Sequence, residues 1–226
     1  MIDFLEDLKI QLNPEIQKVL KHPFFKRLNS GELSKQQIQM FAIDYYFYCQ
    51  CFPQLLGYAA AKIVDDETRM PIIKNLWEEH GEGDIRKSHR VLYTNFLNSL
   101  DLTADEIFSS KPSMSTEKYI NDLLTICNNG TFLDVLALVG PGTEYFASQE
   151  FLIIYEGLSK YDFGRKLDLE YWEIHIEIDD HHSSETLNVI KPYLTSEQNK
   201  RSVFNNSFKT IELELMFWDE LNKWIK

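Results

Sequence analysis

The sequence predicts an all-α protein, a single-domain bundle of seven to eight helices that covers residues 1–226. Apolar residues recur with the period of a helix almost throughout, and no alternating pattern is long enough to predict a strand. The 9 Gly and 7 Pro are too few for a β-rich fold with many turns. With 44% hydrophobic residues, a chain of 226 residues can bury a sizeable core. We find no internal repeat and no linker, so we expect one domain.

The first helices are marked by their caps and prolines. A short helix is expected over about residues 14–20, followed by a loop over residues 22–31. Ser34 then opens a long helix with a capping-box pattern. That helix is apolar on nearly every side, which predicts a central position in the bundle. Pro53 should kink it, because proline removes one hydrogen-bond donor from the helix.

The remainder of the chain is also predicted to be helical. We expect a third long helix over about residues 67–100, loosened in its middle by Gly81 and Gly83. A bend is expected at Gly140-Pro141-Gly142. The further helical regions are 103–109, 115–128, 131–161, 168–194 and 196–226.

Charge and composition exclude several classes of partner. The 23 Lys and Arg against 35 Asp and Glu give a formal charge of −12, which disfavours nucleic acid and anionic membranes. No stretch approaches the roughly 18 apolar residues of a membrane helix, and the N-terminus lacks the pattern of a signal peptide. The 3 Cys predict no disulfide framework. We therefore expect a soluble, cytoplasmic protein.

A candidate metal site lies near the C-terminal end of the chain. His175, Asp179 and His182 stand at i, i+4 and i+7, so they share one face of the predicted helix. Two imidazoles and a carboxylate on one face can bind a divalent metal ion. A solvated acidic helix with scattered His is the alternative, and this spacing alone does not decide between the two.

Two further segments supply residues of the same kind. Glu82 and His89 are seven residues apart, which places them on one face of the expected helix. Glu144 follows the Gly-Pro-Gly bend within apolar surroundings, where a carboxylate needs a partner. A buried Glu144 satisfied by Arg or Tyr is the alternative to a metal ligand. Together the three segments offer three carboxylates and three imidazoles.

This set of ligands suits two Fe²⁺ or Mn²⁺ ions in a helical bundle. Three carboxylates leave such a site one charge short of neutral, which favours an anionic substrate such as a carboxylate, or dioxygen. Zinc is disfavoured because its structural sites prefer four ligands that include Cys. Tyr171 precedes His175 by one turn and should face the same cavity. Packing is its default role, but it is also the candidate catalytic tyrosine.

The chain resembles a known family over most of its length. The residues that carry the resemblance are His22 with Phe24, Gly31-Glu32-Leu33, Phe41 with Asp44-Tyr45-Tyr46, Phe52-Pro53, Glu82 with His89, Glu144, and Tyr171 with His175, Asp179 and His182. They are similar to those of the haem-oxygenase-like dinuclear-iron oxidases, and above all to the chlamydial members, the proteins associating with death domains. The resemblance implies a seven-helix bundle, often a homodimer, with two Fe ions or an Fe/Mn pair and O₂ as co-substrate.

Members of the family that the chain resembles have several different activities. Some members make p-aminobenzoate for folate by consuming their own tyrosine and taking nitrogen from a lysine. In this chain Phe25 and Ile154 stand at those two positions, and they offer neither a phenol nor a nitrogen. We therefore expect an oxygenase or oxidase that acts on a free, small, carboxylate-bearing substrate, with p-aminobenzoate synthesis as one alternative.

Two more classes of protein remain open. The wider superfamily includes thiaminase II (TenA) and the cofactor-free oxidase of pyrroloquinoline quinone synthesis (PqqC). A metal-free enzyme of that kind needs a nucleophilic Cys or a basic cavity, and neither is evident in the sequence. A non-catalytic protein-interaction module would instead show an exposed apolar groove.

Overall fold

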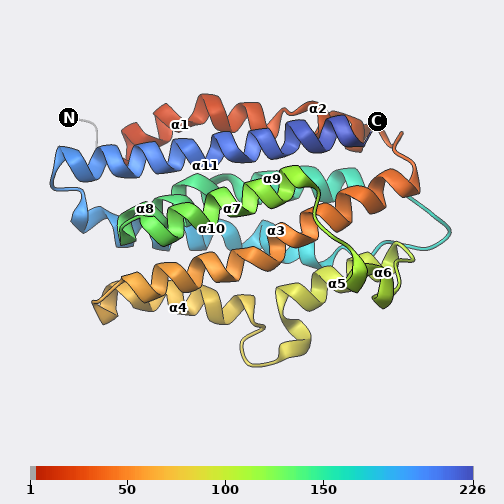
Figure 1. Cartoon of the computed structure of the whole chain (residues 1–226), viewed down its shortest axis with the longest axis horizontal. Coiled ribbons are helices and arrows are strands. Elements are labelled where there is room, and N and C mark those ends of the chain that lie inside the picture. The colour runs from red at the N-terminus through yellow and green to blue at the C-terminus, as the bar shows by residue number, and fades with distance from the viewer. Residues whose placement is uncertain (1–3, 226) are drawn as a thin grey trace.

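The predicted all-α class is confirmed. The computed structural model describes residues 4–225, except for the side chains of residues 177–183, and the described part contains eleven α-helices and no strand. The long helices run roughly side by side, and α1 and α11 form one edge of the bundle (Figure 1). The number of helices exceeds the seven to eight expected, because two of the predicted long helices are interrupted and one predicted loop is helical.

The helices lie close to the predicted ranges. They are α1 (Phe4–Leu20), α2 (Pro23–Ser30), α3 (Lys35–Lys62), α4 (Asp66–Glu79), α5 (His89–Ser99), α6 (Ala104–Ser109), α7 (Met114–Asn129), α8 (Phe132–Val139), α9 (Tyr145–Leu158), α10 (Glu170–Ile190) and α11 (Glu197–Trp224). Three shorter elements, η1 (Ile85–Lys87), η2 (Gly140–Glu144) and η3 (Lys191–Tyr193), connect some of them.

The N-terminal region is more helical than its sequence predicts. Helix α1 begins at Phe4 and not near Pro14, because buried leucines at helical spacing continue its apolar face toward the N-terminus. The predicted loop after it contains α2. Pro23 occupies the first turn of α2, and Nδ1 of His22 accepts a hydrogen bond from the backbone N–H of Phe24 at 3.2 Å.

Helix α3 confirms both its predicted cap and its central position. The side chain of Ser34 accepts from the N–H of Gln37, and the side chain of Gln37 accepts from the N–H of Ser34. The helix is buried at eleven positions, including Asp44. Pro53 lies inside it without ending it, and the kink stays a prediction.

The prediction of a continuous helix over residues 67–100 is wrong. Helix α4 ends at Glu79, the chain turns through residues 80–88, and α5 begins at His89. Gly81 has φ +74°, and a Cβ there would lie 2.3 Å from the carbonyl oxygen of Asp84. The turn is therefore too tight for a side chain at this position. Gly81, expected to loosen a helix, ends it instead.

The predicted bend at Gly140-Pro141-Gly142 is confirmed as the π-helical turn η2 between α8 and α9. All five of its residues are buried. A Cβ on Gly140 would lie 2.4 Å from Cγ2 of Thr186, so glycine lets α10 pass close to this turn. The turn ends at Glu144, which it carries into the interior.

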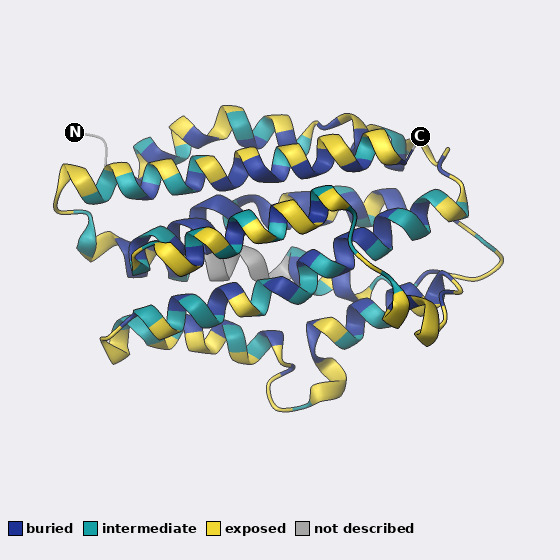
Figure 2. Ribbon diagram, in the orientation of Figure 1, coloured by how far each residue is buried: buried dark blue, intermediate teal, exposed yellow. Residues whose placement is uncertain are grey.

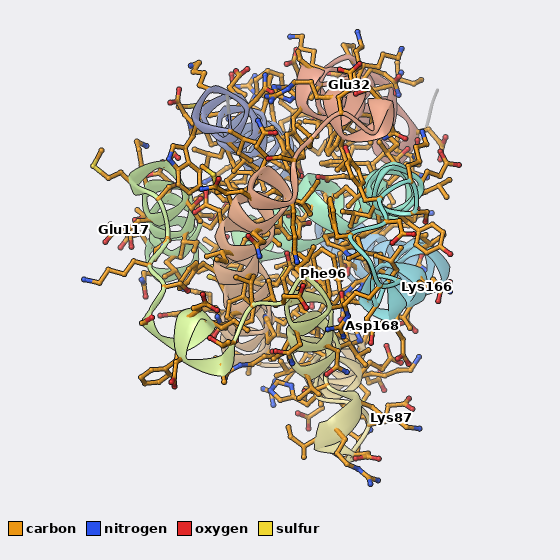
Figure 3. The ribbon with its side chains drawn as sticks, turned by 90° about the vertical axis from the view of Figure 1, so that its right-hand side faces the viewer. Glu32, Lys87, Phe96, Glu117, Lys166 and Asp168 are labelled. Carbon is orange, nitrogen blue, oxygen red and sulfur yellow. The ribbon has the colours of Figure 1, made fainter. Side chains whose placement is uncertain are left out.

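The core is rich in aromatic side chains. Trp172 and Trp218 are fully buried, and the ring of Tyr45 contacts both, with centroid distances of 5.5 and 5.6 Å. Buried residues face the interior along each long helix, whereas exposed residues follow the outer faces (Figure 2). Charged side chains such as Glu117 and Lys166 project from the outside, while Phe96 is buried (Figure 3).

No helix in the described part of the chain combines the length and the apolar character that crossing a membrane requires.

Asp44 anchors the central helix, which gives a test of the fold. Its carboxylate accepts hydrogen bonds from the N–H and Oγ of Ser113 and from Oγ1 of Thr116, at 2.6–2.8 Å, and so joins α3 to the start of α7. Removing it leaves three donors without their acceptor. We expect Asp44→Ala to lower the free energy of unfolding by about 2–4 kcal/mol in urea denaturation. The exposed Asp105 is the control, and Asp105→Ala should change this free energy by less than about 0.5 kcal/mol.

Candidate metal centre

Three buried side chains from separate helices converge inside the bundle. Glu79, His89 and His175 each offer one ligand atom, and these three atoms lie within 4.8 Å of one another. Nδ1 of His89 is 3.1 Å from Oε1 of Glu79. The two imidazole rings meet edge to face with their centroids 4.5 Å apart. A carboxylate and two imidazoles at this separation can bind one divalent metal ion.

The turn between α4 and α5 brings two of these residues together. Glu79 is the last residue of α4 and His89 is the first residue of α5. The tight turn that Gly81 permits lies between them, and across it Oε1 of Glu79 comes within 3.1 Å of Nδ1 of His89. Ser88 caps α5 by accepting from the N–H of Val91, which fixes the start of the helix at His89.

His175 is oriented by its own helix and by aromatic neighbours. Its Nδ1 lies 2.6 Å from the backbone carbonyl oxygen of Tyr171 and donates a proton to it. In the neutral ring Nε2 then carries no proton and is the nitrogen that can bind a metal. Phe151 stacks against the imidazole at a centroid distance of 4.6 Å, which limits its rotation.

Glu144 is a second buried carboxylate at the same site. Nδ2 of Asn75 donates to its Oε1 at 2.6 Å, and Asn75 lies one helical turn before Glu79. Burial raises the pKa of Glu144 to about 8, the hydrogen bond from Asn75 lowers it, and the nearby charge of Glu79 raises it further. A divalent cation next to these two carboxylates would remove the repulsion between them.

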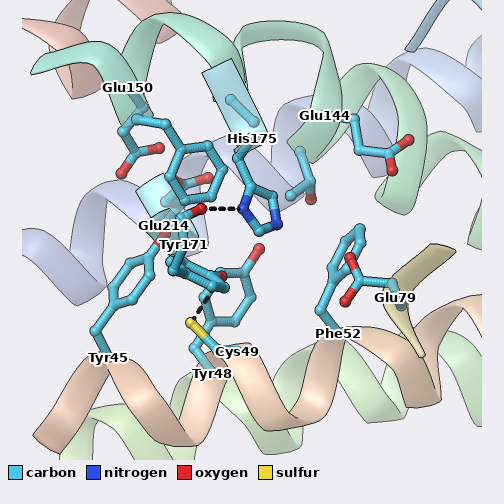
Figure 4. A pocket seen from close by; sticks show the side chains of 13 residues that line it. Tyr45, Tyr48, Cys49, Phe52, Glu79, Glu144, Glu150, Tyr171, His175 and Glu214 are labelled. Carbon is cyan, nitrogen blue, oxygen red and sulfur yellow. Dashed lines mark hydrogen bonds between the residues drawn. The ribbon is translucent and has the colours of Figure 1, made fainter. Parts of the chain in front are cut away.

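The cluster opens into an internal cavity with a volume of about 40 Å³, room for a few water molecules. Figure 4 shows Glu79 and Glu144 at one end of it, Glu150 and Glu214 at the other, and His175 between them. The described residues that line the cavity are Tyr45, Tyr48, Cys49, Phe52, Glu79, Thr143, Glu144, Ala147, Glu150, Phe151, Tyr171, His175 and Glu214.

Tyr171 lies in this cavity, as predicted. Its ring centroid is 4.4 Å from that of His175, and its hydroxyl donates to Sγ of Cys49 at 3.1 Å. Burial raises the pKa of both the phenol and the thiol well above their ordinary values, so both groups keep their protons at neutral pH. A thiol held in this way is a poor nucleophile.

The structure brings together three of the six predicted metal ligands. His89, Glu144 and His175 are buried at the site. Glu82 is exposed in the turn after α4, with φ +53°, and is not part of the cluster. The helix face that it was expected to share with His89 does not exist, because the helix ends before it. The side chains of Asp179 and His182 lie outside the described part of α10.

Glu79 is the residue that sequence reasoning missed. A spacing of seven from His89 selects Glu82 only if one continuous helix joins them. Gly81 and Gly83 were the available signal, since two glycines so close together favour a break. With a break at that point, the last carboxylate of the first helix becomes the neighbour of the first imidazole of the next.

The raised pKa of Glu144 predicts a pH-dependent stability in the metal-free protein. The folded state holds this proton more tightly than the unfolded chain. Its contribution to the free energy of unfolding is therefore full below pH 4.5 and is lost as the pH rises through about 8. In the wild-type protein the free energy of unfolding should decline over this pH range. We expect Glu144→Gln to reduce that decline by at least about 1 kcal/mol, the equivalent of roughly one pKa unit. Urea denaturation in the presence of a chelator, at both ends of this pH range, measures it. Glu82→Gln, in the exposed turn, should leave the decline unchanged.

Comparison with known proteins gives a consistent picture. A family model described as an iron-containing redox enzyme matches residues 39–215. A 4-aminobenzoate synthase from Chlamydia pneumoniae is 28% identical, and the alignment covers 100% of this chain and 96% of that protein. A 4-chloro-allylglycine synthase from Streptantibioticus cattleyicolor is 22% identical over 88% of this chain and 76% of its own length.

The fold is likewise known. A domain of unknown function with a haem-oxygenase-like fold from Shewanella denitrificans superimposes with a TM-score of 0.78 and 18% sequence identity. The match covers 99% of this chain and 94% of that one. The predicted haem-oxygenase-like fold is confirmed.

Proposed function

The chain belongs to the family of iron-containing redox enzymes, and from this premise we propose that it is an O₂-activating oxidoreductase that uses two iron ions, or an Fe/Mn pair, on a small substrate. The observation that carries the proposal is the convergence of Glu79, His89 and His175 on one buried point beside a cavity. The mixture of imidazole and carboxylate ligands fits iron or manganese.

We assign the metal ligands accordingly. Glu79, His89 and His175 would hold one ion, and the buried carboxylate of Glu144 is a candidate ligand of the second. Asp179 and His182 complete the set, since they follow His175 on α10 at helical spacing. Glu79 thus replaces Glu82 in the ligand set predicted from the sequence. When bound, the metal supplies redox and Lewis-acid chemistry.

The surrounding residues prepare the site for that chemistry. The carbonyl of Tyr171 fixes the tautomer of His175, and Asn75 holds the carboxylate of Glu144 toward the cavity. The aromatic walls exclude bulk water, which strengthens electrostatic interactions inside. Tyr171 keeps its phenolic proton and lies next to His175, so it is a candidate proton donor inside the cavity.

Synthesis of 4-aminobenzoate is a second candidate function, because a full-length relative carries that name. The two positions that depart from the self-sacrificing members are both buried. Phe25 packs edge-on against Trp218 with a centroid distance of 4.7 Å, and Ile154 is fully buried. Neither side chain can donate a phenol or an amine, which favours a substrate that enters from outside.

A metal-free enzyme and a non-catalytic module receive less support. The former needs an activated thiol or a basic cavity, but Cys49 is held as a thiol and four carboxylates line the cavity. For a protein-interaction module or the expected homodimer, the available surface is an exposed stripe of Met70, Ile73 and Trp77 on α4. Both the homodimer and its use of this stripe stay predictions.

Ligand variants test the metal assignment. We expect His175→Ala and Glu79→Gln to weaken iron binding by more than the roughly 10–100-fold that outer-shell partners contribute, with little loss of helicity. Elemental analysis after loading with iron, together with circular dichroism and O₂ uptake, measures this. Glu82→Gln is the matched control and should bind as much iron as the wild-type protein. Full iron in Glu79→Gln together with its loss in Glu82→Gln would reverse the assignment.

Complementation separates the two candidate functions. We expect no rescue of a p-aminobenzoate auxotroph by the wild-type chain, because Phe25 and Ile154 supply neither of the sacrificed groups. A chlamydial 4-aminobenzoate synthase serves as the positive control. Rescue that depends on Tyr171 would favour synthesis of 4-aminobenzoate over the action on an external substrate.

A further inference from the structure

A cysteine and a tyrosine from two different helices meet at the wall of the cavity. The hydroxyl of Tyr171 on α10 donates a hydrogen bond to Sγ of Cys49 on α3 at 3.1 Å (Figure 4). The two residues are 122 positions apart along the chain, so they meet through the packing of α10 near α3. Cys49 is not among the proposed metal ligands, and its position beside this phenol therefore needs another explanation.

The hydrogen bond determines which atoms of the two side chains face each other. A phenolic O–H prefers the plane of its ring, because the oxygen is conjugated with the ring. The sulfur that accepts from it therefore lies beside a ring carbon ortho to the oxygen. The ring of Tyr171 is held in place by edge contacts with Tyr93 and Trp172, at centroid distances of 4.8 and 5.1 Å. Sγ of Cys49 thus faces one edge of a fixed aromatic ring.

The pair also lies next to the proposed metal centre. The ring centroid of Tyr171 is 4.4 Å from that of His175 and 6.4 Å from that of His89. Cys49 is half-buried and lines the cavity together with Tyr171, so its sulfur has room to move toward the ring. A thiol is readily oxidised, and the ortho carbons of a phenol are electron-rich and couple with oxidised sulfur. A thiol in contact with a phenol beside a site that activates O₂ is therefore a target for oxidative coupling.

We propose that Cys49 and Tyr171 become joined by a thioether bond, from Sγ to the ring carbon ortho to the hydroxyl, when the iron-loaded protein meets O₂. The S–H bond of Cys49 and the ortho C–H bond of Tyr171 break, and the S–C bond forms. The two hydrogen atoms reduce one O₂ to hydrogen peroxide. The phenolic hydroxyl is retained, so Tyr171 can still donate a proton, but its ring is now tied covalently to α3. This modification rests on the proposed function, because it needs both the metal and O₂.

Mass spectrometry tests for the cross-link directly. Protein made in anaerobic, iron-depleted culture is loaded with Fe²⁺ without air and divided, and one half is then exposed to air. We expect most of the aerated protein to lose the mass of two hydrogen atoms and to keep this loss under a reducing agent, which excludes a disulfide. Alkylation of the denatured, aerated protein should modify two of the 3 Cys, and all three in the anaerobic half. Peptide mapping should find the peptide of Cys49 joined to that of Tyr171.

Three variants locate the bond. Cys49→Ser and Tyr171→Phe should each abolish the loss of mass. Cys49→Ser should still bind as much iron as the wild-type protein, because Cys49 is outside the proposed ligand set. Cys51→Ser is the matched control: Cys51 lies on α3 two residues after Cys49 and is buried, and its replacement should leave the cross-link intact. Circular dichroism shows that each variant is folded.

The outcomes separate the cross-link from the proposed function. Wild-type protein that binds iron and consumes O₂ but keeps its full mass overturns the cross-link and leaves the proposed function standing. Protein that takes up no iron in elemental analysis and keeps its full mass contradicts both. Addition of oxygen to Cys49, or a bond mapped from Cys49 to Tyr45 or Tyr48, which line the same cavity, also overturns the proposal. So does a cross-link that forms equally well in air without iron.

Discussion

The burial of ionisable side chains at the centre of the bundle is the constraint on which the rest of the structure depends. Glu79, Glu144, His89 and His175 lie where water does not compensate their charges. Such groups persist only when other residues or a metal ion supply what water would have supplied. Asn75 and the backbone carbonyl of Tyr171 do so in part. A divalent cation would provide the remainder, because it would offset the carboxylate charges directly.

Two local departures from regular α-helix deliver these groups to one place. The tight turn after α4 sets Glu79 beside His89, and the π-helical turn η2 carries Glu144 inward. Both depend on glycine for a close approach, at Gly81 to the backbone of its own turn and at Gly140 to Thr186. The irregular elements are therefore the ones that build the site, which is common for functional residues.

The cavity has two chemically different ends. Imidazoles and carboxylates meet at one end, while Glu150, Glu214 and Tyr45 line the other.

The sequence by itself determined the helical class, the capping box at Ser34, the break at Gly140-Pro141-Gly142 and two imidazoles of the cluster, His89 and His175, because each follows from local periodicity or local backbone chemistry. It did not determine Glu79, since that choice depends on where one helix ends, and a spacing of seven selects Glu82 when the helix is taken as continuous. Nor did it reveal that Glu150 and Glu214 line one end of the same cavity, because they are far apart along the chain and come together only through the packing of the helices. Periodicity tells which face of a helix a residue occupies, but only tertiary packing decides which faces meet.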